Sequence, residues 1–224
     1  MGDAPTKPGK ADDATVSPAM ADGFNRALDE AGRFFMGQAD VHRALEAVVA
    51  LLERERIPYA IAGAMAMNLH GFRRVTEDVD LILSRESLAA FKAVALGHGY
   101  VEKYPGSKGV RDTVNNVGLD FLLVGDFPGD GKPKPVAFPD PSIAVRVPRG
   151  TLLIATVPLA KLIELKLASG MSAPHRLKDL ADVVELIRKL KLERGLGHAL
   201  DPSVRGKYDE LWIPAQVWDP IAEE

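Results

Sequence analysis

The sequence feature that most constrains the fold is the stretch at residues 59–84, which reads YAIAGAMAMNLHGFRRVTEDVDLILS. Its first four residues form an apolar run typical of a buried strand, and Gly63 interrupts that run. Residues 64–69 have the length and composition of one or two helical turns. A strand, a glycine and a helix start in this order leave backbone N–H groups free just after Gly63. Such groups form a natural seat for a phosphate.

A second predicted strand, at residues 78–83, carries two aspartates. Because alternate residues of a strand share a face, Asp78 and Asp80 point the same way, whereas Val79 and Leu81 point into the core. Neighbouring carboxylates repel each other unless a cation or a proton lies between them. One or two carboxylates plus substrate phosphates are the usual ligands of Mg²⁺. The stretch therefore predicts a phosphate seat and a metal-binding pair close together.

Composition sets broad limits on the function. The chain has 224 residues, of which 46% are hydrophobic and 26% charged, as in ordinary globular proteins. It has no cysteine, which excludes disulfides and thiolate metal sites. No apolar run approaches the length of a membrane span and no signal peptide is recognisable, so we expect a cytoplasmic protein without a membrane partner. The net charge of −3 indicates no strong basic field for nucleic acid.

The segments before and after the central stretch are predicted mainly as helices and short strands. Residues 1–22 are predicted to be a disordered tail. A helical pattern starts near Phe24, resumes at Asp40 and stops before Pro58. Ser84 is expected to cap a helix that runs to Leu96. Further elements are predicted as strands within residues 100–124, 143–147 and 152–157, a proline-rich loop at 126–142, and helices at 158–168, 173–192 and 205–212.

This order predicts an α+β fold, with a small mixed β-sheet flanked by N- and C-terminal helices. We divide the chain into the tail at residues 1–22, a core with its leading helices at 23–156, and a C-terminal helical region at 157–224 packed on the core. Within residues 117–124, Leu119 and Phe121 share one face of a strand, and Asp120 lies on the other.

Charged residues in the two C-terminal helices interrupt their apolar faces. Lys166 falls on the side of Leu162 and Ile163, where an ammonium group is costly unless it reaches water or meets an anion. In the next helix, an apolar arc that begins at Leu177 has Asp179 near its edge. These positions single out a lysine and an aspartate as candidates for a site.

With these residues in place, the sequence resembles the DNA-polymerase-β-like nucleotidyltransferases, particularly the minimal and abortive-infection toxin branch. That branch has a Gly-Gly or Gly-Ser turn, an Arg-x-Thr-x-Asp-x-Asp run, a third acidic residue on a neighbouring strand, and a lysine helix followed by a Lys-Asp helix. The resemblance covers residues 57–190. The matching residues are Gly63, Ala64, Arg74, Thr76, Asp78, Asp80, Asp120 and Lys166, together with the run from Arg176 to Asp182, which contains Asp179. The second turn residue, Ala64, departs from the pattern, so no side-chain hydroxyl contacts phosphate there.

The resemblance implies a Mg²⁺-dependent nucleotidyltransferase that uses a nucleoside triphosphate. Asp78, Asp80 and Asp120 are expected to hold the metal, and Asp120 to help deprotonate the acceptor hydroxyl. Asp179 is expected either to orient Lys166 or to complete the acceptor side. The residues assigned to nucleotide binding are Gly63, Ala64, Arg74, Thr76, Lys166 and Asp179. An RNA end or a protein hydroxyl is the expected acceptor, and a toxin-like role implies an antitoxin partner. A small-molecule acceptor such as an aminoglycoside stays open.

Two other functions are compatible with the same residues. The first is a phosphatase with an aspartate nucleophile, in which the first aspartate follows an apolar strand. Here the residues before Asp78 are mostly polar, since residues 73–77 read RRVTE, and this order argues against the phosphatase. A non-catalytic relative that binds a nucleotide or a partner protein is the remaining alternative, and Ala64 favours it.

Each candidate residue also has a purely structural interpretation. Gly63 could form an ordinary turn, Asp120 could face solvent, Lys166 could extend to water and Asp179 could only interact with its helix dipole. His70 is interpreted as structural. The basic residues of the C-terminal helices could contact RNA phosphates or form a solvated face: Lys161, Lys178, Arg188, Lys189, Lys191 and Arg194.

Overall fold

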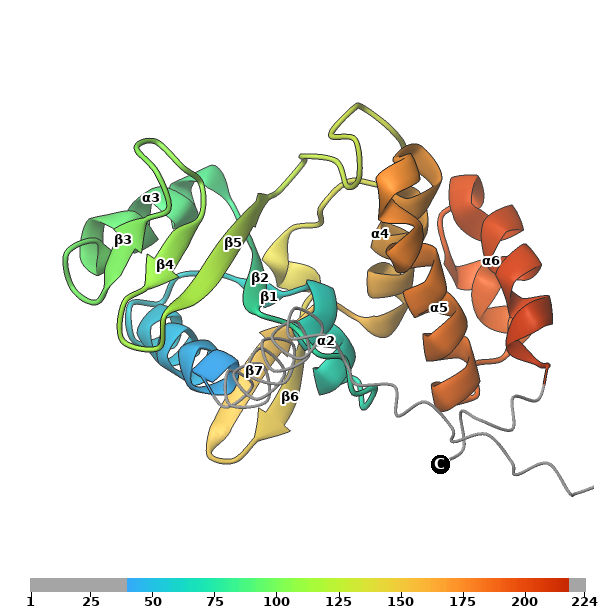
Figure 1. Ribbon diagram of the computed structural model, residues 1–224, viewed down its shortest axis with the longest axis horizontal. Coiled ribbons are helices and arrows are strands. Elements are labelled where there is room, and N and C mark those ends of the chain that lie inside the picture. The colour runs from blue at the N-terminus through green and yellow to red at the C-terminus, as the bar shows by residue number, and fades with distance from the viewer. Residues whose placement is uncertain (1–39, 218–224) are drawn as a thin grey trace, which may run out of the picture. The chain divides into compact units, whose positions relative to one another are not determined.

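The leading helix covers residues 40–54 of the computed structural model, which describes residues 40–217 (Figure 1). Its apolar stripe, which includes Leu45, Val48 and Leu52, is fully buried. The helix ends before Pro58, as expected from the restriction that proline places on the preceding residue. The predicted tail at residues 1–22 and the helix start near Phe24 lie outside the described residues.

Seven strands form one mixed sheet with the order β3-β4-β5-β2-β1-β7-β6. The pairs β2–β5 and β1–β7 are parallel, and the other pairs are antiparallel. Together with the flanking helices, this sheet confirms the predicted α+β class. In chain order the strands are β1 (Ala60–Ile61), β2 (Asp78–Leu83), β3 (Tyr100–Glu102), β4 (Val110–Asp112), β5 (Val117–Leu123), β6 (Val145–Arg149) and β7 (Leu152–Thr156).

Two helices lie between the strands of the first half. The short helix α2 (Gly63–Leu69) follows β1 directly, and α3 (Arg85–Ala95) follows β2. The prediction that Ser84 caps α3 is confirmed, because its hydroxyl accepts a hydrogen bond from the backbone N–H of Ser87. The rings of α3 and β5 pack together in the core, with Phe91 and Phe121 centred 5.0 Å apart.

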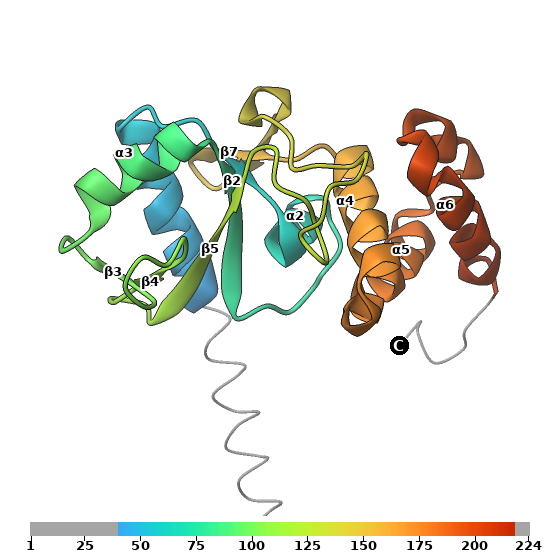
Figure 2. The same ribbon diagram turned by 90° about the horizontal axis from the view of Figure 1, so that it is seen from above.

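The C-terminal part is helical and contacts the first part through α2. Both views place α4, α5 and α6 side by side, and α4 also packs against α2 (Figures 1 and 2). One apolar core runs through both parts, from Val41 to Ala215, so their division at residue 157 remains a prediction. The helices are α4 (Leu159–Ser172), η2 (Pro174–Arg176), α5 (Leu177–Leu190), η3 (Arg194–Ala199) and α6 (Pro202–Ala215), with a further 3₁₀ turn, η1 (Pro141–Ile143), before β6.

The structure corrects several sequence predictions. The last helix is longer than residues 205–212, because Asp201 caps it and Pro202 occupies its first position. Leu177 is not part of the apolar arc of α5: it is the first residue of the helix, turns outward and is 65% exposed. The first strand of the β6–β7 hairpin begins at Val145 rather than at residue 143, where the η1 turn ends.

Candidate functional site

Three aspartates gather on one face of the sheet. In the parallel pair β2–β5, Asp80 lies directly opposite Asp120, and Asp78 lies opposite Gly118. Partial and complete burial alternate along β5, as predicted, with Leu119 and Phe121 in the core. Asp78, Asp80 and Asp120 therefore share the face turned away from that core, and we call them the acidic face.

The electrostatics of Asp80 reflect this crowding. The pKa of its carboxyl group is raised to about 7, first by burial and then by the negative charges of Asp78 and Asp120. Lys166 and Arg176 oppose the shift. A carboxylic acid that keeps its proton near neutral pH is one that a bound cation would ionise, because the cation relieves the repulsion among the three groups.

Gly63 makes room for Asp80. Its φ angle of +57° lies in the left-handed region, which glycine adopts at little cost. A Cβ atom at this position would stand 1.9 Å from Oδ2 of Asp80, so no side chain fits there. Gly63 is the first residue of α2, and Ala64 the second. The first hydrogen bond of the helix runs from the backbone N–H of Ala66 to the carbonyl of Ala62. The N–H groups before Ala66 therefore have no partner within the helix, and they start beside the acidic face.

The other two carboxylates of the acidic face have side-chain partners. The hydroxyl of Thr76 donates to Oδ1 of Asp78 at 2.8 Å. The ammonium group of Lys103 lies 2.6 Å from Oδ1 of Asp120. The sequence assigned Thr76 to nucleotide binding. In the structure its hydroxyl is bonded to Asp78, and its contact with a nucleotide stays a prediction.

Lys166 is buried and does not extend to water. Its Nζ donates to Oδ2 of Asp182 at 2.7 Å and to Oδ1 of Asp179 at 3.2 Å. Asp179 also accepts hydrogen bonds from Ser169, at 2.7 Å, and from Arg176, at 3.0 Å. Burial alone would raise the pKa of Asp179, but these cationic and hydroxyl partners hold it below its ordinary value.

Arg74 connects this network to the segment before the acidic face. Its Nε lies 3.0 Å from Oδ1 of Asp182. The backbone around Arg74 is fixed by Asn68 of α2, whose side chain accepts from the Arg74 N–H and donates to the Arg74 carbonyl. Arg74 and Lys166 therefore converge on one carboxylate of α5.

A cleft of about 270 Å³ lies between the acidic face and α4–α5. Its polar lining includes Gly63, Asp80, Lys166, Arg176 and Asp179. Its apolar lining comes from β5, the loop after it and α4, and consists of Leu122, Phe127, Pro128, Phe138, Leu162 and Leu165.

The cleft gathers some of the predicted site residues but not all. Gly63, Asp80, Lys166 and Asp179 line it, whereas Ala64, Arg74, Thr76, Asp78 and Asp120 stand outside its lining. Sequence reasoning missed Lys103 and Ser169 as members of the site, and it named Arg176 and Asp182 only as the two ends of the motif run at residues 176–182, without a role for either. The spacing of Asp182 three residues after Asp179, and of Ser169 three after Lys166, was the available signal, because such residues share a helix face.

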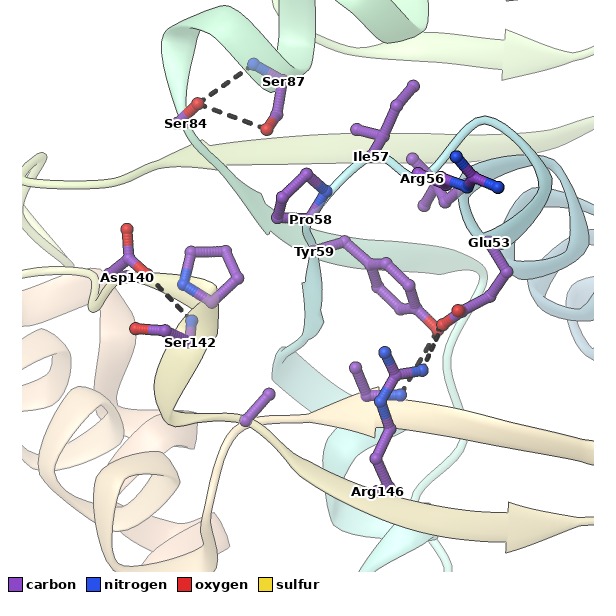
Figure 3. A pocket seen from close by; sticks show the side chains of 14 residues that line it. Glu53, Arg56, Ile57, Pro58, Tyr59, Ser84, Ser87, Asp140, Ser142 and Arg146 are labelled. Atoms are coloured by element: carbon purple, nitrogen blue, oxygen red, sulfur yellow. Dashed lines mark hydrogen bonds and ion pairs between the residues drawn. The ribbon is translucent and has the colours of Figure 1, made fainter.

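A wider cleft, of about 650 Å³, lies elsewhere and contains none of the predicted site residues (Figure 3). There the Tyr59 hydroxyl donates to Glu53 at 2.9 Å, and Glu53 also pairs with Arg146. Across the cleft, Ser84 and Asp140 use their side chains to cap α3 and η1. Its polar groups are thus engaged in holding the fold.

Two further candidates have structural partners. A ring nitrogen of His70 lies 2.7 Å from the carbonyl oxygen of Val157, in agreement with the structural interpretation of this residue. Among the basic residues of the C-terminal helices, several pair with carboxylates, as on a solvated face. These are Lys161 with Glu164, Arg188 with Glu185 and Arg194 with Asp209.

As their side chains stand, no group of three or more histidine, aspartate or glutamate residues among residues 40–217 is arranged to hold a metal ion. The chemistry of the acidic face nevertheless fits a hard divalent cation. Its donors are carboxylate oxygens, and the charges of Asp78 and Asp120 disfavour the ionised form of Asp80, which a cation would stabilise. Thr76 is bonded to one carboxylate oxygen of Asp78 and Lys103 to one of Asp120, so an ion at these oxygens competes with those partners.

No protein-family model matches the chain, and no curated protein is similar enough in sequence to count as a relative. Within the described part of the chain, none of the helices has both the length and the apolar character needed to cross a membrane.

Proposed function

We propose that this protein is a Mg²⁺-dependent nucleotidyltransferase that transfers a nucleoside monophosphate from a nucleoside triphosphate to a hydroxyl acceptor. The observation that carries the proposal is the environment of Asp80. Its pKa is raised to about 7 beside Asp78 and Asp120, and it lines a cleft that also contains Lys166 and Arg176. Carboxylates that bind a metal ion, placed next to cationic side chains that bind phosphate, are the two parts of a metal–nucleotide site.

Asp78, Asp80 and Asp120 would hold the metal. When bound, Mg²⁺ supplies positive charge that neutralises the triphosphate and the leaving pyrophosphate. Gly63 contributes space rather than a ligand to the metal, because its missing side chain lets Asp80 lie against the start of α2.

The chain's own groups position the nucleotide. The first N–H groups of α2 and the cations Lys166 and Arg176 bind phosphate oxygens in the cleft. The aromatic side chains Phe127 and Phe138, in the apolar lining, offer a surface for the base. Asp179 orients Lys166, and Asp182 orients both Lys166 and Arg74.

Transfer requires one proton movement and one displacement. The acceptor oxygen attacks the α-phosphorus in line, a new P–O bond forms, and the bond to pyrophosphate breaks. Asp120 takes the proton of the acceptor hydroxyl, for which the carboxylate has to leave Lys103. An RNA end or a protein hydroxyl is the acceptor we propose, in a toxin-like cytoplasmic role with an antitoxin as partner.

The test is incubation of the protein with each α-labelled nucleoside triphosphate and Mg²⁺, with total RNA or cell protein as the acceptor. We expect label to be transferred by the wild type and not by Asp80→Asn. Asp126→Asn is the matched control, because Asp126 lies beyond β5 and pairs with Arg85 and Lys108 outside the acidic face. Equal transfer by wild type and Asp80→Asn would contradict the proposal. Mg²⁺-dependent nucleotide binding without transfer would instead indicate the non-catalytic relative.

A further inference from the structure

Lys103 reaches the acidic face from two strands away. It follows β3 directly, and its backbone N–H donates to the carbonyl of Gly109 at 3.3 Å, just before β4. Its side chain extends across β4 to β5, where Nζ lies 2.6 Å from Oδ1 of Asp120. The pair joins the edge of the sheet to the strand that lies beside β2.

Two glycines leave the space for this side chain. A Cβ on Gly118 would stand 3.0 Å from Nζ of Lys103 and 3.2 Å from its Cε. A Cβ on Gly109 would stand 3.4 Å from Cδ of Lys103 and 2.7 Å from Oδ1 of Asp120. The alkyl chain of Lys103 therefore lies against the backbone at Gly109, just before β4, and at Gly118 of β5. The absence of side chains at these two positions allows the ammonium group to reach Asp120.

The ammonium group of Lys103 lies close to Gly118 as well as to Asp120. Gly118 is the direct neighbour of Asp78 in the parallel pair, and Asp120 is the direct neighbour of Asp80. A cation over Gly118 that touches Asp120 is thus at the border of the acidic face. With Lys103 in place, the formal charge of the three ionised aspartates and the lysine is −2 rather than −3.

The pair is open to exchange. The side chain of Lys103 is 27% exposed and that of Asp120 is 41% exposed. Ion pairs with this much access to water contribute little stability, so a divalent cation can displace the ammonium group from Asp120. Lys108, in the same hairpin, pairs instead with Asp126 and provides a natural comparison.

We propose that Lys103 is a tethered counter-ion that competes with the divalent cation for Asp120 and so sets the metal affinity of the site. This inference rests on the proposed function, since it assumes a cation at the acidic face. Lys103 is a positioning residue: it holds Asp120 while the metal is absent and releases it when the metal binds.

The test is Mn²⁺ binding to the nucleotide-free protein, followed by the paramagnetic signal of free Mn²⁺, which requires no turnover. We expect Lys103→Met to bind Mn²⁺ about threefold to tenfold more tightly than wild type at low salt, because the ammonium group that competes with the ion for Asp120 is removed. The difference should shrink in about 0.5 M salt, where exposed charges are screened. Lys103→Gln, which keeps a polar group without the charge, should bind as tightly as Lys103→Met.

Equal or weaker Mn²⁺ binding by both Lys103 variants would overturn the proposal. Lys108→Met should match wild type, and the effect of Lys103→Met should vanish in an Asp120→Asn background, where the competition has no carboxylate to act on. If neither wild type nor Lys103→Met binds Mn²⁺ at a site that Asp80→Asn removes, the proposed function fails, and this inference fails with it. Binding that is lost in Asp80→Asn yet insensitive to Lys103 overturns this inference alone.

Discussion

The carboxylate of Asp80 lies directly against the α-carbon of Gly63, because a Cβ atom added to the glycine would be 1.9 Å from Oδ2 of the aspartate. Gly63 also has a φ angle of +57°, a backbone conformation that is unfavourable for residues other than glycine. Two independent restrictions thus act on one position. The turn between β1 and α2 and the central carboxylate of the acidic face depend on each other.

We expect Gly63→Ala to reduce both stability and nucleotide binding. The left-handed backbone costs about 1 kcal/mol for alanine, and displacement of Asp80 adds to it, for a total of roughly 2–4 kcal/mol. Denaturant unfolding measures the stability, and titration with a nucleoside triphosphate and Mg²⁺ measures the binding.

Gly150→Ala is the matched control for this substitution. Gly150 has nearly the same φ angle, +58°, but a Cβ there meets nothing within 4 Å. It reports the backbone cost alone, about 1 kcal/mol, with binding unchanged. Similar losses in the two variants would mean that the contact with Asp80 is not a constraint.

The pKa of Asp80 predicts how stability depends on pH. In the unfolded chain this carboxyl group ionises near pH 4, and in the folded protein it ionises at about 7. Between these values the folded state binds the extra proton, so the free energy of unfolding falls as pH rises from about 4 to 7, by a few kcal/mol at most. Above pH 7 both states are ionised and the loss is constant.

Asp80→Asn should remove most of this slope, because the amide does not titrate. The variant should resemble wild type near pH 4 and be more stable than wild type at pH 8, as measured by chemical unfolding across the range. Asp78→Asn should give part of the same effect, since Asp78 is one of the charges that raise the Asp80 pKa. A wild-type slope retained in Asp80→Asn would assign the pH dependence to another group.

We expect Lys166→Met to destabilise the fold by about 3 kcal/mol, because the substitution leaves two buried carboxylates without their shared ammonium group. Asp182→Asn in the same background should restore part of the loss. Lys178→Met serves as the control, since Lys178 is an exposed lysine of α5, and its loss should change stability by less than about 0.5 kcal/mol. Comparable stabilities of the two lysine variants in thermal and denaturant unfolding would argue against a buried network.

Local chemistry made much of the fold readable from the sequence. The period-2 alternation at β2 and β5, the cap at Ser84 and the break at Pro58 each depend on neighbouring residues only. Helix ends were less accurate where a tertiary contact decided them. The outward turn of Leu177 after the η2 turn, for example, has no signal in helical periodicity.

The candidate site was predictable where it lies on one strand and obscure where it spans elements. The spacing of Asp78 and Asp80 determines that they share a face. The neighbouring position of Asp120 required the parallel register of β2 and β5, which a single sequence does not encode locally. Lys103 escaped notice for the same reason: its partner is 17 residues away and on another strand, across two glycines.

Arg74 and Lys166 share Asp182, and this predicts that Arg74, which lies outside the cleft lining, is energetically coupled through α5 to the nucleotide-binding lysine. Asp182→Asn should weaken nucleotide binding by about tenfold, because both cations lose the carboxylate that orients them. In a double-mutant cycle, Arg74→Ala should weaken binding in the wild type but much less in Asp182→Asn, since the arginine is already misplaced there. Isothermal titration with a non-hydrolysable triphosphate measures the four affinities. Strictly additive losses would show that Asp182 holds the helices together without positioning Arg74.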